Sequence, residues 1–307
     1  IIAYRRPLLL HAFHAKPLIF SRIAAGLAAS PRPLLVATIT GLGNAFVAGG
    51  LTSRLASLGY RLAAPGYDAV IFQNEDDRRI FAHRGWVTPD RAFSIVSSGV
   101  ELVDLGVADP PPEGPLRVLM MSRLLRQKGV HEYVAAARRV KASIPEVRFL
   151  LAGEFEASHP DAVPGRDLEE IQREGVVEFL GYLHQPATIL RSCALLVFPS
   201  YYREGCPRVV LEAGACAVPT IGADAPGTRE AILHGETGCL VPPRDVTALA
   251  AAMESLLRDP DRRRRYGQAA RRFVEKEFAM SVIVERHFRL YRRLGVLQGD
   301  KPEGAGP

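Results

Sequence analysis

Residues 194–217 read ALLVFPSYYREGCPRVVLEAGACA, and this stretch decides the fold. Its apolar start, Ala194–Pro199, predicts a buried strand. Pro207–Ala217 predicts a helix that begins at a proline, where a missing N–H costs nothing. The polar loop between the two holds Glu204 and Gly205. A strand, a loop and a helix in this order form one unit of a parallel sheet covered by helices.

The same alternation continues outward from this stretch, so we expect an α/β fold. Strands are predicted at Arg117–Met121, Val147–Ala152, Val177–Leu180 and Pro219–Gly222, and helices at His131–Ser143, Asp167–Glu174, Pro186–Cys193, Thr247–Leu257, Asp261–Glu277 and Val282–Leu294. Nearer the start we expect a helix after Pro17, an apolar run at Leu34–Thr40, a helix at Leu51–Ala63, an apolar run at Ala69–Phe72 and a helix at Glu75–Arg84.

The chain has 307 residues, a length that favours two domains. Val107–Pro115 holds four prolines and a glycine, and this stiff connector is the best boundary. We expect a partial N-terminal domain at 1–108, a second domain at 116–280, a helix at 281–297 that packs back toward the N-terminal domain, and a disordered tail at 298–307. The start at Ile1 resembles the middle of a domain, so we expect that an N-terminal segment is missing.

The composition points to a globular protein with a basic surface. The net charge of +6 favours contact with phosphates or an anionic surface, and general solubility is the equally open alternative. No apolar run reaches the roughly 18 residues of a membrane helix. The four cysteines show no C-x-x-C pairing, so we expect reduced thiols in a cytoplasmic protein.

Cationic side chains gather in the loop that follows the strand Arg117–Met121. Arg123, Arg126 and Lys128 lie there just before a predicted helix. Two or three cations beside a helix N-terminus suit a diphosphate, which needs its charge neutralised. The alternative is a solvated basic loop.

Two carboxylates, Glu204 and Glu212, flank the start of the predicted helix at Pro207. If the segment were helical throughout, eight steps would separate them by about 12 Å. The two carboxyls of a retaining glycosidase lie only about 5–5.5 Å apart. We therefore expect the two acids to contact different parts of one ligand. The alternative is an acid at the helix N-terminus and an unrelated exposed acid.

In these segments the chain resembles the retaining family 4 glycosyltransferases (glycosyl transferases group 1) of bacterial polysaccharide type. Glu204-x7-Glu212, with Gly205 after the first Glu, is similar to the family's E-x7-E segment, and Ser122-Arg123 through Lys128-Gly129 to its S-R-x4-K-G loop. Leu151-Ala-Gly153, Phe179-Leu-Gly181, Pro199-Ser200 and Gly235-x-x-Gly238 through Pro242 follow in the family's order, and Phe13–Phe46 matches more weakly. The resemblance implies the GT-B fold, in which two Rossmann-like domains with parallel sheets face each other across a cleft. Here the N-terminal domain is expected to be incomplete.

The resemblance also implies roles for individual residues. Arg123 and Lys128 would bind the donor diphosphate, and Glu204 would contact the donor sugar. The remaining donor-side residues would be Gly205 and Cys206 through their backbone N–H groups, Pro207 at the helix N-terminus, Glu212 at the ribose and Leu183 near the base. His14 and Lys16 are candidates for the acceptor side, although a histidine beside an apolar run is more often structural.

The implied reaction moves a hexose or N-acetylhexosamine from a nucleotide-diphosphate sugar, UDP-linked in our expectation, to a lipid-linked or polysaccharide acceptor. It proceeds with retention, and a diphosphate oxygen takes the acceptor proton. Two alternatives stay open: a nucleotide-sugar epimerase of the same fold, and a donor-binding fragment without activity. We expect a cytoplasmic protein, with peripheral contact at the inner face of the plasma membrane as an option, and no nucleic-acid partner.

No cofactor and no catalytic metal are expected. Asp259-Pro-Asp261 matches a D-x-D metal pattern by its letters, but it lies between two predicted helices. An aspartate in that position is more typical of a helix cap. The basic run Arg262–Arg265 predicts a solvated helix face, with contact to anionic lipid as the alternative.

Overall fold

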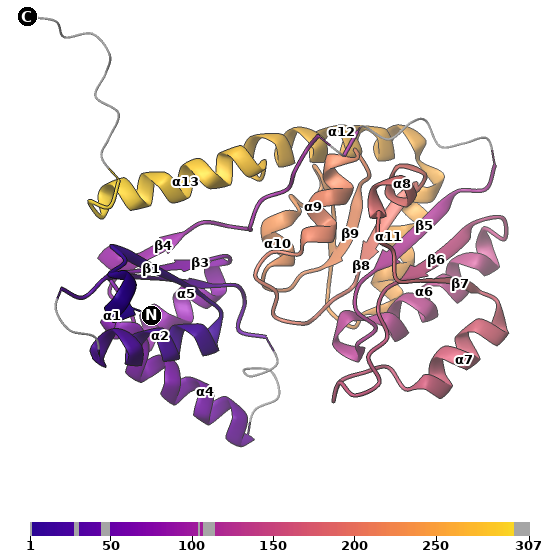
Figure 1. Ribbon diagram of the computed structural model, residues 1–307. Helices are drawn as coiled ribbons and strands as arrows, with labels where there is room; N and C mark the ends of the chain where they lie inside the picture. The colour runs from indigo at the N-terminus through magenta and orange to yellow at the C-terminus, as the bar shows by residue number, and fades with distance from the viewer. Residues whose placement is uncertain (1, 28–30, 44–49, 104, 107–113, 298–307) are drawn as a thin grey trace, which may run out of the picture. The chain divides into compact units, whose positions relative to one another are not determined.

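The computed structural model describes residues 2–27, 31–43, 50–103, 105–106 and 114–297 (Figure 1). The chain divides into two compact units. The first unit comprises residues 1–97 together with the segment from Ser281, and the second unit comprises Ser98–Met280. The predicted disordered tail at 298–307 and most of the proline-rich connector fall outside the described residues.

The first unit is built on a four-stranded parallel sheet in the order β1-β2-β3-β4. Its strands are β1 (Leu9–Phe13), β2 (Leu34–Ile39), β3 (Ala69–Phe72) and β4 (Ala92–Ser94), and its helices are α1 (Ile2–Arg5), α2 (Ala15–Leu27), α4 (Gly50–Ala63), α5 (Glu75–His83) and α13 (Met280–Arg293). One part of its core is aromatic: the Phe81 ring lies 5.0 Å from the rings of both Phe72 and Trp86, edge-on to each. Such edge-to-face pairs add to the free energy gained by burial.

A half-buried histidine lies at the sheet of the first unit. His11 Nδ1 lies 2.7 Å from the Tyr291 hydroxyl, and its Nε2 lies 2.7 Å from Thr38 Oγ1. Burial, and to a smaller degree the nearby His287, lowers the pKa of His11 from 6.5 to about 4. His11 is therefore neutral in the folded protein at neutral pH.

The lowered pKa makes the stability of the first unit depend on pH. An unfolded histidine takes up a proton below pH 6.5, whereas folded His11 does so only near pH 4. The free energy of unfolding should therefore fall as the pH decreases from 6.5 toward 4. Urea unfolding followed by the fluorescence of buried Trp86 measures this at pH 7 and pH 5. Between pH 7 and pH 5, His11→Gln should lose less unfolding free energy than the wild type. The control is His83→Gln, at an exposed histidine, which should lose as much as the wild type. Equal losses in all three proteins would show that His11 does not cause the pH dependence.

The second unit is built on a six-stranded parallel sheet in the order β10-β9-β8-β5-β6-β7. Its strands are β5 (Arg117–Met121), β6 (Arg148–Ala152), β7 (Val177–Gly181), β8 (Leu195–Phe198), β9 (Thr220–Ala223) and β10 (Gly238–Val241), and its helices are α6 (Val130–Ser143), α7 (Gly165–Glu174), α8 (Pro186–Arg191), α9 (Arg208–Ala215), α10 (Thr228–Ala231), α11 (Val246–Arg258) and α12 (Pro260–Glu277). The chain fills one side of the sheet from β5 to β7 and then returns to β8 on the other side of β5. The order of the strands therefore reverses between β5 and β8, which is where ligands bind in open sheets of this kind.

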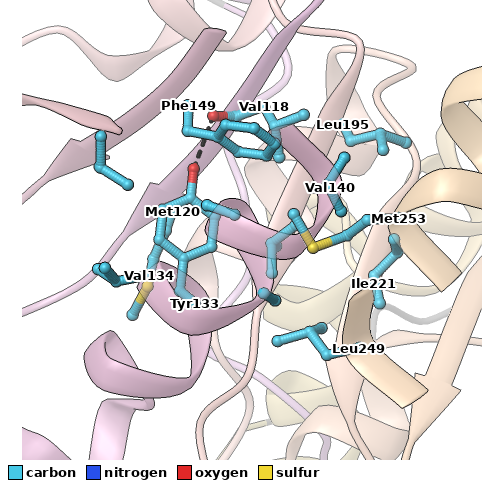
Figure 2. Packing of buried hydrophobic residues seen from close by; sticks show 14 of the residues in the cluster. Val118, Met120, Tyr133, Val134, Val140, Phe149, Leu195, Ile221, Leu249 and Met253 are labelled. Carbon is cyan, nitrogen blue, oxygen red and sulfur yellow. Dashed lines mark hydrogen bonds between the residues drawn. The ribbon is translucent and has the colours of Figure 1, made fainter. Parts of the chain in front are cut away.

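The core of the second unit lies between this sheet and its helices. Figure 2 shows α6 side chains such as Val134 and Val140 packed among residues from β5, β6 and β8. Tyr133, also on α6, is fully buried, and its hydroxyl lies 2.8 Å from the Val118 carbonyl oxygen. The buried hydroxyl is thus satisfied by the backbone of a central strand, which fixes α6 against the sheet.

Most of the predicted elements are found within one to three residues of their expected bounds. Three strands, β1, β4 and β10, are not predicted from the sequence. Each contains polar or small residues, such as His11 and Gly238, so no clear apolar run marks it. The predicted helix cap is confirmed: the Asp259 side chain accepts a hydrogen bond from the Arg262 amide at 2.9 Å.

The four cysteines are free thiols. Burial raises the pKa of Cys193 and of Cys216 to about 11, so both stay protonated at neutral pH. Cys206, in the loop after β8, is only partly buried.

Candidate active site

A pocket of about 280 Å³ opens beside the switch point of the second unit. The ends of β5 and β8 and the segments that follow them, up to the start of α9, supply most of its wall, and the loops after β6 and β7 supply the rest. Its lining consists of Met121, Ser122, Arg123, Lys128, Gly153, Glu154, Tyr182, Leu183, Phe198, Glu204, Pro207, Arg208 and Val209. The pocket thus lies at the carboxyl ends of neighbouring strands.

An ion pair between Lys128 and Glu204 joins the two loops inside the pocket. The Lys128 side chain is 9% exposed and the Glu204 side chain 15% exposed. The Ser200 hydroxyl also lies 3.2 Å from Glu204 Oε1, and Lys128 Nζ lies 4.7 Å from the centre of the Tyr202 ring. Two charges this deeply buried are costly unless each has a partner. A buried, paired cation beside an open pocket is therefore well placed to meet an anionic ligand.

Backbone contacts hold the β5 and β8 loops together. The carbonyl oxygen of Gln127 accepts hydrogen bonds from the amides of Tyr201 at 3.0 Å and Tyr202 at 3.1 Å. The next turn closes at Gly129, whose φ of +82° is readily adopted only by glycine. A Cβ there would lie 2.5 Å from the Pro199 carbonyl oxygen. Gly129 therefore allows the Lys128 loop to lie directly against the end of β8.

The structure places five of the predicted donor-side residues in the pocket lining, namely Arg123, Lys128, Glu204, Pro207 and Leu183. Gly205, Cys206 and Glu212 do not belong to that lining. Glu212 is instead paired within α9, where Arg208 Nε lies 2.8 Å from its Oε1. The Glu212 side chain is 14% exposed, against 68% for Arg208.

The segment from Glu204 to Glu212 is not helical throughout. Helix α9 begins only at Arg208, with Pro207 as the residue before it in an extended conformation. The four residues from Glu204 to Pro207 therefore do not rise by 1.5 Å each, and the estimate of about 12 Å does not apply to them. What the structure shows is that the two carboxylates have different partners, Lys128 and Arg208.

The two acceptor-side candidates belong to the first unit and are both exposed. His14 follows β1 with a positive φ of 70°, and its Nδ1 is hydrogen-bonded to Thr40 Oγ1. Positive φ is uncommon for a residue with a side chain and is worth attention where it occurs at the end of a strand. Lys16 lies in the first turn of α2.

Three pocket residues, Glu154, Tyr182 and Arg208, are not singled out by the sequence alone. Glu154 and Tyr182 lie within two residues of the ends of β6 and β7. Their position at the carboxyl ends of these strands is the signal that would have found them. Gly227 lies outside the pocket lining but supports it, and it too is not singled out by the sequence. A Cβ on it would lie 2.7 Å from the Glu204 carbonyl oxygen, so its lack of a side chain makes room for Glu204.

Among the described residues, no group of three or more His, Cys, Asp or Glu side chains is arranged to hold a metal ion. The positive charge at the pocket comes from Arg123, Lys128 and Arg208.

Comparison with known proteins places the chain in a family. The family model for glycosyl transferases group 1 matches residues 108–273. Glycogen synthase of Mycobacterium tuberculosis is 31% identical over 205 residues, which is 65% of this chain and 48% of that protein. The chain therefore spans about half the length of this curated relative.

Solved structures agree with the fold. Sucrose-phosphate synthase from Thermosynechococcus elongatus aligns with a TM-score of 0.80 and 25% identity over 94% of this chain and 74% of that one. Anabaena HepE, solved in complex with UDP-glucose, aligns with a TM-score of 0.77 and 21% identity over 94% and 79% of the two chains. The two parallel α/β sheets are those of the GT-B class. The matched residues include both loops of the pocket, and the chain belongs to the glycosyl transferases group 1.

Proposed function

We propose that this chain belongs to a retaining glycosyltransferase. The enzyme transfers a hexose or N-acetylhexosamine from a UDP-linked donor to a lipid-linked or polysaccharide acceptor. The observation that carries the proposal is the buried Lys128–Glu204 pair in a pocket at the switch point of a parallel sheet. The names of the relatives support the substrate classes: HepE was solved with UDP-glucose, and another relative is a glycogen synthase.

Arg123 and Lys128 are the groups that we assign to the donor diphosphate. Both line the pocket, and hydrogen bonds from a cation to a phosphate are roughly twice as strong as neutral ones. Their charge would also stabilise the nucleotide as it departs, when negative charge develops on the β-phosphate. Two side-chain cations would supply the charge neutralisation that a metal ion supplies in other sites, and we therefore propose a metal-independent reaction.

Glu204 is the group that we assign to the donor sugar. In the structure its carboxylate neutralises Lys128. When a diphosphate takes Lys128 as its partner, the carboxylate can accept hydrogen bonds from sugar hydroxyls. Glu212, which is paired with Arg208 on α9, is assigned to the ribose. In this scheme the backbone N–H groups of Gly205 and Cys206 face the ligand, and Leu183 lies near the base.

In the reaction, the bond between the anomeric carbon and the β-phosphate oxygen breaks, and the electron pair stays on the departing diphosphate. The acceptor hydroxyl forms the new bond to the anomeric carbon from the same face, which retains the configuration. Its proton passes to a diphosphate oxygen. No covalent sugar–enzyme bond is needed, and Glu204 and Lys128 act by position and charge.

Calorimetric titration with UDP tests this assignment. Lys128→Ala should weaken UDP binding by about tenfold to a hundredfold, because a hydrogen bond to a charged group contributes about 1.5–3 kcal/mol. Lys276→Ala is the matched control, since that lysine lies on α12 outside the pocket and is 82% exposed. UDP affinity that is unchanged in Lys128→Ala would rule out the proposed diphosphate site.

A further inference from the structure

Two consecutive tyrosines follow β8, and each ring lies against a different cation. The guanidinium carbon of Arg244 lies 4.2 Å from the centre of the Tyr201 ring, and Lys128 Nζ lies 4.7 Å from the centre of the Tyr202 ring. Both tyrosines are half-buried. A cation within about 6 Å of the centre of an aromatic face is attracted to it. The Tyr202 ring is therefore a second partner of Lys128, besides Glu204.

The Tyr202 ring contacts Lys128 from outside the pocket lining. Lys128, Glu204 and Phe198 line the pocket, whereas Tyr202 does not. The centre of the Phe198 ring lies 5.8 Å from Lys128 Nζ, so two aromatic rings lie near the same ammonium group. The Lys128 side chain is only 9% exposed, and a cation is held more strongly by an aromatic face where water is excluded. Tyr202 can thus fix the ammonium group without taking the place of a ligand.

A backbone hydrogen bond fixes the ring relative to the lysine. The amide of Tyr202 donates to the carbonyl oxygen of Gln127 at 3.1 Å, and Gln127 directly precedes Lys128. The two residues that form the cation–ring contact therefore cannot move apart without breaking this bond. The contact is held by the fold of the two loops and does not depend on two mobile side chains meeting by chance.

The two partners of Lys128 differ in what they leave for a ligand. The Glu204 carboxylate neutralises the ammonium group, whereas the Tyr202 ring is neutral and holds the ammonium group without cancelling its charge. A lysine that is mobile before binding loses side-chain freedom when a ligand orders it, and this weakens the affinity. A lysine that the ring already holds avoids this loss. Tyr202 therefore offers what Glu204 cannot: an ordered cation whose charge stays available to an anion.

We propose that Tyr202 is a positioning residue for the donor diphosphate and that it acts through Lys128. This inference rests on the proposed function, in which Lys128 binds the diphosphate and Glu204 exchanges the ion pair for the donor sugar. At that exchange Lys128 loses its anionic partner in the protein. The Tyr202 ring then keeps the ammonium group at the pocket wall, where the diphosphate lies.

Calorimetric titration of the full chain with UDP tests the proposal. Tyr202→Leu should weaken UDP binding by about threefold to tenfold, which is the cost of ordering one long side chain on binding. Tyr202→Met also lacks the ring and should show the same loss. Tyr202→Phe keeps an aromatic face and should bind UDP within about twofold of the wild type. The matched control is Tyr266→Leu, because the Tyr266 ring lies 5.1 Å from the Arg262 guanidinium carbon on α12, outside the pocket lining. This control should leave UDP affinity unchanged.

Two further measurements separate positioning of Lys128 from a general loosening of the loops. In a Lys128→Ala background, Tyr202→Leu should have no further effect on UDP affinity, since no ammonium group remains to be placed. Tyr202→Leu should also leave the affinity for uridine unchanged, measured by competition with UDP, because uridine carries no phosphate. Loosened loops would instead weaken UDP binding in both backgrounds and would weaken uridine binding as well.

Three results would overturn the proposal: wild-type UDP affinity in Tyr202→Leu, an equal loss in Tyr202→Phe, or the same fold loss when Lys128 is already alanine. UDP binding that depends on Lys128 but not on Tyr202 would leave the proposed function standing and defeat this inference alone. A wild-type chain that does not bind UDP would defeat both. Thermal unfolding followed by circular dichroism shows that each variant is folded.

Discussion

Glu204→Gln is expected to transfer sugar about a hundredfold more slowly than the wild type and to bind UDP about fivefold more tightly. The loss of transfer follows from replacing a charged acceptor of sugar hydroxyl hydrogen bonds with a neutral amide, which costs up to about 3 kcal/mol. The gain in UDP affinity follows from the ion pair. Glu204 neutralises Lys128 before the donor binds, and its carboxylate repels the incoming diphosphate. Removing one such repulsion in a partly solvated pocket is worth about 1 kcal/mol.

Two measurements on the same variant separate these effects. Calorimetry gives the UDP affinity, and release of UDP from UDP-glucose in the presence of an acceptor gives the rate of transfer. Glu169→Gln on α7 is the control, since this exposed glutamate lies outside the pocket and should leave both values unchanged. A Glu204→Gln variant that binds UDP more weakly than the wild type, or transfers sugar at the same rate, would contradict the role given to this carboxylate.

Gly129→Ala is expected to destabilise the strands beside the pocket by about 3 kcal/mol or more. A left-handed backbone costs a residue with a Cβ about 1–2 kcal/mol, and forcing extra volume into packed structure costs about 1–3 kcal/mol more. Both costs apply at Gly129, where φ is +82° and the new Cβ would lie 2.5 Å from the Pro199 carbonyl oxygen.

Gly175→Ala isolates the first of these costs. Gly175 also has a positive φ, of 69°, but no atom lies within 4 Å of a Cβ placed there. The Gly175→Ala variant should therefore lose only about 1–2 kcal/mol of unfolding free energy. Because the single tryptophan, Trp86, lies in the first unit, hydrogen exchange of the β5 and β8 amides is the suitable measurement. Equal protection of these amides in the two variants would show that the contact between Gly129 and Pro199 does not hold the loops together.

The sequence predicts the second unit well because its central strands are unbroken apolar runs. Strands β5, β6 and β8 are buried on both faces, and such strands stand out from the helices between them. The ends of elements and the short strands β1 and β4 depend instead on tertiary contacts, which periodicity does not report. The family resemblance is confirmed by the match to residues 108–273.

The contacts within the pocket lie beyond what the sequence shows. Lys128 and Glu204 are 76 residues apart, and only the reversal of strand order at β5 and β8 brings them together. The pairing of Arg208 with Glu212 is local, at a spacing of four, and is readable from the sequence once a helix is assumed. The leucines of α4 show another limit of the sequence. Periodicity reveals that Leu51, Leu55, Leu58 and Leu62 share a face, but not that this face is exposed.

The most direct test of the central claim is a crystal structure of this chain with UDP-glucose bound. The account predicts the diphosphate within hydrogen-bonding distance of Arg123 and Lys128, the sugar hydroxyls at Glu204, and the ribose at Glu212. The Lys128–Glu204 ion pair seen without ligand should be replaced by contacts to the donor. A donor bound with its diphosphate away from Lys128, or with the ion pair intact and the sugar remote from Glu204, would contradict the account.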